Sequence, residues 1–131
     1  MSETAPLPSR KARWTAHLLG LLACANLLFS AGIKQVQPTG IPEHFAHLGW
    51  AMASVPALGF LEFACTILYL IPRTAVLGAI LLTAYLGGAA AAHVRIGETG
   101  VALYPAILGL ALWAALYLRH PRLRGLIPLH G

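Results

Sequence analysis

Four long apolar runs limit what this chain can fold into more than any other feature. They cover about residues 14–33, 55–71, 74–92 and 101–118. A helix that rises about 1.5 Å per residue needs about 20 apolar residues to cross a bilayer core. Charged residues make up only 10% of the 131 residues, against about a quarter in soluble domains. The sequence therefore predicts an all-α integral membrane protein, a four-helix bundle without a separate soluble domain.

The segments outside the four runs are short. Residues 1–13 and 119–131 are basic and contain prolines, so we expect tails that flank a membrane domain at 14–118. Pro38, Gly40 and Pro42 should break the chain after the first run. We expect one or two interfacial helical turns from Glu43 to about Ser54, and then a kink at Pro56 before the second span.

Lysines and arginines are divided unequally between the segments on the two sides of the membrane. With a cytoplasmic N-terminus, only Lys34 and Arg95 lie outside. Seven bases then lie inside: Arg10, Lys11, Arg13, Arg73, Arg119, Arg122 and Arg124. Because cytoplasmic segments of membrane proteins carry an excess of lysine and arginine, both termini are predicted to be cytoplasmic.

Glu62 is the clearest ionisable residue inside an apolar run. A charged side chain at the centre of a spanning helix costs about 2.5–3.5 kcal/mol on insertion scales, so it needs a partner or a function. Lys34, His93 and Arg95 lie at run ends on the same predicted outer side. Glu62 should pair with Lys34 or Arg95, or otherwise be protonated. The candidate cluster of Lys34, Glu62, His93 and Arg95 is either an ion pair that fixes helix register or a polar binding pocket.

Small residues recur at helical spacing in the third run. Ala84, Gly88 and Ala92 are four residues apart, and Gly87 lies on the adjoining row. Such rows let helix backbones approach closely in membranes, where apolar burial alone does not drive association. We expect a packing seam here, with a lipid or cofactor lying against the glycines as the alternative.

Other kinds of chemistry have little support in the sequence. Cys24 and Cys65 lie inside apolar runs without CxxC spacing, and His44 and His47 alone form a weak metal signal. There is no Ser/His/Asp order, paired carboxylate or phosphate loop, and the net charge of +5 lies in tails and turns instead of a nucleic-acid face. No catalytic residue and no metal site are therefore predicted, and no nucleic-acid partner.

Several segments resemble the DoxX-like family of membrane proteins. The central one is IPRTAVLGAILLT at residues 71–83, followed by YLGGA at 85–89 and HVR at 93–95. Residues 29–34, 59–62 and 113–126 add weaker similarity, and Ala84 stands where the family motif is expected to have a glycine.

This resemblance implies a small four-helix bundle in a bacterial cytoplasmic (inner) membrane, often without an assigned activity. The wider group is linked to thiosulfate and quinone oxidoreduction and to redox-stress complexes. The resemblance also implies that the polar positions of the family are occupied here by Lys34, Glu62, His93 and Arg95.

Our leading functional expectation is an accessory subunit whose outer polar pocket binds a quinone, a lipid or a partner protein. The alternatives are a component of a membrane oxidoreductase and a minimal oligomeric transporter. The sequence leaves open whether the chain is catalytic. The partners we expect are membrane lipid and either a second copy of the chain or a redox partner protein, and a quinone is the only cofactor suggested.

Overall fold

The computed structural model describes residues 8–126 and consists of helices joined by short turns, with no strand among those residues. Four helices are long and apolar enough to cross a membrane, which confirms the predicted all-α membrane bundle. Two short helices and one 3-10 turn complete the described chain. In order, the elements are α1 (Arg10–Val36), α2 (Ile41–His47), η1 (Met52–Ser54), α3 (Val55–Leu70), α4 (Ala75–Arg95), α5 (Thr99–Arg119) and α6 (Pro121–Leu126).

The ends of the helices follow from local residue chemistry. The Ser9 side chain accepts a hydrogen bond from the backbone N–H of Ala12 and caps the start of α1. Gln37 ends α1 in the left-handed region at a φ of 49°. Ile71, which precedes Pro72, is extended and ends α3, as expected for a residue before proline.

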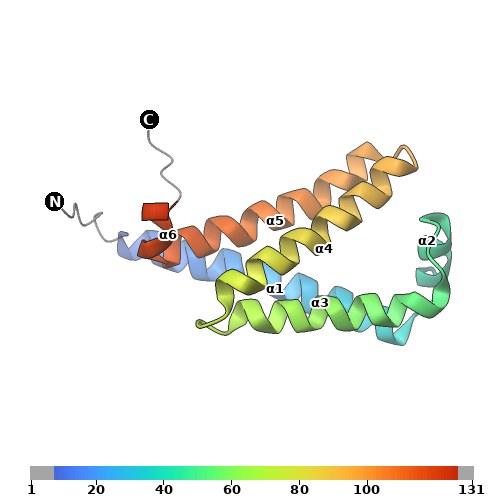
Figure 1. Ribbon diagram of the computed structural model, residues 1–131, viewed down its shortest axis with the longest axis horizontal. Helices are drawn as coiled ribbons and strands as arrows, with labels where there is room; N and C mark the ends of the chain where they lie inside the picture. The colour runs from blue at the N-terminus through green and yellow to red at the C-terminus, as the bar shows by residue number, and fades with distance from the viewer. Residues whose placement is uncertain (1–7, 127–131) are drawn as a thin grey trace.

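The long helices form a ring. Helix α1 packs against α3 and α5, and α4 packs against the same two neighbours. Figure 1 shows that the start of α1 lies near α6 at one end of the bundle, while α2 lies at the opposite end. Small and aliphatic side chains fill the interior, and large apolar ones face outward, as a lipid environment requires. Examples of the outward residues are Leu22, Phe29, Phe60 and Leu110.

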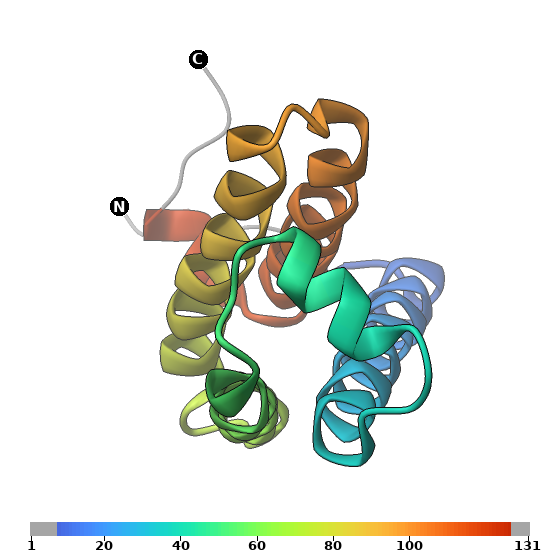
Figure 2. The ribbon, with the colours of Figure 1, turned by 90° about the vertical axis from the view of Figure 1, so that its right-hand side faces the viewer.

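Helix α2 crosses the end of the bundle instead of running along it. Figure 2 shows it lying over the space that the four long helices surround. Phe45 and Leu48 are both buried, so the α2 segment packs apolar side chains down onto the bundle. Gly40 and Gly49 flank it with positive φ angles of 94° and 78°, which allow the chain to turn sharply on either side. We refer to this end as the α2 end.

The predicted kink at Pro56 is wrong. Pro56 stands in the first turn of α3, directly after the 3-10 turn η1, and a new helix begins there. A proline is tolerated in the first helical turn because the N–H that it lacks would have no intrahelical acceptor.

The described ends of the chain are more helical than the predicted tails. Helix α1 already begins at Arg10, inside the tail predicted at 1–13, and α6 lies within the one predicted at 119–131. The remaining parts of those predictions, residues 1–7 and 127–131, lie outside the described residues.

Two glycines outside the predicted row provide the close contacts. A Cβ on Gly59 would lie 2.8 Å from Lys34 Cβ and 2.9 Å from the carbonyl oxygen of Ala31, so α1 and α3 meet there. A Cβ on Gly78 would lie 2.5 Å from Tyr69 Cα, where α4 leaves α3. The backbones therefore approach most closely at these two positions.

The row of small residues on α4 does not form the expected seam within the chain. A Cβ on Gly87 or Gly88 would meet nothing within 4 Å, and Ala84 is exposed. Ala84, Gly88 and Ala92 instead line a cavity at the α2 end.

Candidate functional site

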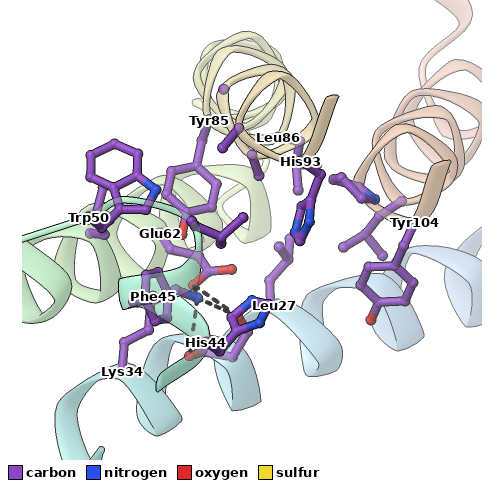
Figure 3. A pocket seen from close by; sticks show the side chains of 18 of the residues that line it. Leu27, Lys34, His44, Phe45, Trp50, Glu62, Tyr85, Leu86, His93 and Tyr104 are labelled. Atoms are coloured by element: carbon purple, nitrogen blue, oxygen red, sulfur yellow. Dashed lines mark hydrogen bonds and ion pairs between the residues drawn. The ribbon is translucent and has the colours of Figure 1, made fainter. Parts of the chain in front are cut away.

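A cavity of about 380 Å³ lies at the α2 end. All four long helices contribute to its wall, and α2 covers it with His44 and Phe45 (Figure 3). Most of the wall is aliphatic or aromatic, including Leu27, Leu86 and Tyr85. The ring of helices surrounds a space that the short α2 closes at one end.

A buried ion pair lies in this wall. Glu62 on α3 is only 2% exposed, and its Oε2 lies 2.7 Å from the ammonium nitrogen of Lys34 on α1. The Ser30 hydroxyl donates to the same oxygen at 3.2 Å. Of the two partners expected for Glu62, the structure therefore selects Lys34.

The Lys34 ammonium has an acceptor for each of its three hydrogens. Besides Glu62, its Nζ donates to the Ser30 hydroxyl at 2.5 Å and to the Ser30 carbonyl at 3.4 Å. It also lies 5.9 Å from the centre of the Phe45 ring, on the side of α2. Ser30 and Glu62, both within the bundle, therefore accept all the hydrogen bonds that the Lys34 ammonium can donate.

His93 lines the same cavity but contacts a different acid. Its Nδ1 lies 2.8 Å from Oε2 of Glu98, the residue that precedes α5, and His47 of α2 contacts the other oxygen at 2.8 Å. These two hydrogen bonds lower the pKa of Glu98 below its ordinary value. Glu98 therefore links α2 to the end of α4 as a carboxylate.

His44 faces His93 across the covered end of the cavity, with ring centres 5.7 Å apart (Figure 3). Removal from water and the nearby His93 lower the pKa of His44 below its ordinary value. The neutral ring is thereby favoured, and it offers one donor and one acceptor.

Arg95 does not join the Lys34–Glu62 pair. Its guanidinium donates to the backbone carbonyl of Leu48, just after α2, and it lines a second, outer hollow. Trp50, Gly88 and Ala92 line both this hollow and the cavity, so the two share a wall.

The candidate cluster is thus divided. Lys34, Glu62 and His93 line one cavity, whereas Arg95 lies beside it. Sequence reasoning missed Ser30, His44 and Glu98 as members of the site. Glu98 carried a signal, because it is an acid on the same predicted side as His47 and only five residues after His93.

Two acidic side chains at the α2 end already have partners within the described part of the chain. Within residues 8–126, no group of three His, Cys, Asp or Glu side chains is placed to hold a metal ion. Glu62 already pairs with Lys34, and Glu98 lies between two imidazoles.

Comparison with known proteins supports the resemblance noted in the sequence. Searches of curated proteins and of solved structures found no match. A family model described as the DoxX-like family matches residues 18–115, most of the 131-residue chain. That range contains all of α2, α3 and α4, and all of the residues that line the cavity. The chain belongs to the DoxX-like family.

Proposed function

We propose that this chain is an accessory subunit of the bacterial cytoplasmic membrane that binds a quinone-class ring, oxidised or reduced, in the cavity beneath α2. The observation that carries the proposal is a cavity of about 380 Å³ with an apolar wall and a few polar groups at its covered end. Sites for small organic ligands commonly have about 300–1,000 Å³ and this distribution of polarity.

The chemistry of the wall favours a flat ring with oxygen substituents. Phe45, Tyr85 and Leu86 offer surfaces on which an apolar ring can pack, and Figure 3 shows Tyr85 and Phe45 on the same side as Glu62. His44 and His93 supply hydrogen-bonding nitrogens. The link between the wider DoxX group and quinone oxidoreduction, which belongs to relatives of this chain, favours the same ligand class.

We expect a ligand that dissolves in lipid to enter the cavity from the side of the outer hollow. The shared wall of Trp50, Gly88 and Ala92 separates the cavity from the outer hollow. Gly88 has no side chain, and the space where a Cβ would stand is empty within 4 Å. Small residues of α4 therefore lie between the cavity and the outer hollow.

Thermal unfolding of the purified protein in detergent tests the proposal. We would add a short-tailed benzoquinone, or its hydroquinone under reducing conditions, to wild type and to two variants. The double variant Lys34→Met with Glu62→Met removes the ion pair from the cavity without leaving an unpaired charge. Glu43→Gln alters an exposed acid on α2 that does not line the cavity and serves as the control.

At least one redox form should raise the melting temperature of wild type and of Glu43→Gln, because a ligand that binds only the folded state stabilises it. The double variant should lose this shift. The proposal is wrong if neither form stabilises wild type, or if the double variant keeps the full shift.

A further inference from the structure

The hydrogen-bond donors of Lys34 and Ser30, at the charged end of the cavity, are already used by the protein. All three Lys34 hydrogens have acceptors in Ser30 and Glu62. The Ser30 hydroxyl gives its own hydrogen to Glu62. A ligand that reaches this end therefore finds neither the ammonium nor the hydroxyl free to donate to it.

Glu62 retains capacity to accept. An ionised carboxylate has about four lone-pair positions and no hydrogen to donate. Lys34 and Ser30 use two of them, and the phenol of Tyr85, which lies next to Glu62 in Figure 3, occupies at most one more. At least one position is left for a donor on a ligand.

His93 also presents a hydrogen-bond acceptor to the cavity, and its contact with Glu98 is the reason. Glu98 is kept ionised by its contacts with His93 and His47, and a carboxylate only accepts hydrogen bonds. When the His93 ring carries a single hydrogen, that hydrogen must be on Nδ1, because Nδ1 faces the Glu98 carboxylate, which can only accept. The other nitrogen, Nε2, is left as an acceptor on a ring that lines the cavity, and it bonds to no group within the described residues.

We infer that the end of the cavity formed by Glu62 and His93 recognises a hydrogen-bond donor, so that the site selects the ring hydroxyl of a hydroquinone over the ring carbonyl of a quinone. This inference rests on the proposed function and specifies which form of the ligand the site takes. His44 does not set the preference, because a neutral imidazole can either donate or accept.

Three ligands of nearly the same shape test the inference. A short-tailed hydroquinone carries two hydroxyls, its dimethyl ether cannot donate, and the quinone carries only acceptors. Binding to the full-length protein in detergent would be titrated anaerobically at about pH 8, where imidazoles are mostly neutral.

Wild type should bind the hydroquinone at least about tenfold more tightly than the ether and the quinone, because a lost hydrogen bond to a buried charged acceptor costs about that much in affinity. A quinone that binds as tightly as the hydroquinone overturns the inference but leaves the proposed function standing. Absence of binding by all three ligands overturns both.

Glu98→Gln examines the role assigned to His93. A glutamine amide can donate to Nδ1, which allows the His93 hydrogen to move to Nε2 and to face the cavity. The preference for hydroquinone should then fall to about threefold or less, whereas the control Glu43→Gln should keep the wild-type preference. An unchanged preference in Glu98→Gln would remove His93 from the recognition of the hydroxyl.

Discussion

Lys34 and Glu62, 28 residues apart in the chain, form a buried ion pair that joins α1 to α3 at 2.7 Å. The helices are in close contact beside it, because Gly59 lies against Lys34 Cβ and the carbonyl of Ala31. The pair therefore fixes the register of α1 against α3 at the point where the cavity begins. Burial of either charge alone would cost free energy, whereas each charge offsets that cost for the other when they are paired.

Removal of one charge should damage the fold more than removal of both. Lys34→Met or Glu62→Met alone leaves an uncompensated buried charge, which we expect to reduce the free energy of unfolding by about 3–5 kcal/mol. The double variant should be more stable than either single variant. Unfolding in detergent, followed by circular dichroism, measures all four proteins. Additive losses in the double variant would contradict the pairing.

Gly78→Ala should be strongly destabilising. The added Cβ would lie 2.5 Å from Tyr69 Cα and 2.7 Å from the carbonyl carbon of Leu68, and backbone atoms cannot move aside easily. We expect a loss of about 3 kcal/mol. Gly87→Ala on the same helix is the matched control, since nothing lies within 4 Å, and alanine favours a helix by about 1 kcal/mol over glycine. Equal effects of the two changes would show that α4 packs differently.

The folded protein should lose stability in acid, because protonation of Glu98 removes its contribution. Hydrogen bonds from His93 and His47 lower its pKa in the folded protein, while an unfolded glutamate titrates near about 4.3. Its contribution is therefore complete above about pH 4.3 and is lost as the pH falls through the lower, folded value. We expect Glu98→Gln to melt at a lower temperature than wild type at pH 6, with the difference shrinking toward pH 3. A difference in melting temperature that stays constant across this pH range would show that the Glu98 carboxylate does not cause it.

The orientation predicted from the basic residues can be measured with single cysteines. Cys24 and Cys65 are both buried, so they should react little with an impermeant thiol reagent. In intact bacterial cells, Glu43→Cys should be labelled from outside, whereas Arg122→Cys should be labelled only after the membrane is permeabilised. The opposite pattern would place the α2 end in the cytoplasm and reverse the predicted topology.

Hydropathy was sufficient to predict four membrane helices but not their ends. Helix α1 runs from Arg10 to Val36, beyond the apolar run at 14–33, because a helix can continue into the polar membrane surface. Pro56 was interpreted as a kink, yet a proline that follows a turn can equally begin a helix.

The site was predictable only where burial carried an energetic cost. A charged group within a span signals a partner, so the sequence predicted that Glu62 pairs with Lys34 or Arg95, and the structure shows that the partner is Lys34. Glu98 lies outside the spans, where a charged side chain has no insertion cost and so does not signal a partner. Its contacts with His93 and His47 depend on how α2 crosses the bundle. The row at Ala84, Gly88 and Ala92 marked a special face of α4, but spacing does not reveal that the face lines a cavity.

Photoaffinity labelling most directly tests whether the cavity beneath α2 holds a quinone-class ring. A photoreactive short-tailed quinone or its hydroquinone would be cross-linked to the purified protein, and the labelled residues would be identified by mass spectrometry with and without excess unlabelled compound. We predict competable labels on cavity residues of α1, α2 and α4, such as Leu27, Phe45 and Tyr85. Labels confined to outward-facing residues such as Phe60 and Leu110, or labels that excess ligand does not displace, would contradict the account.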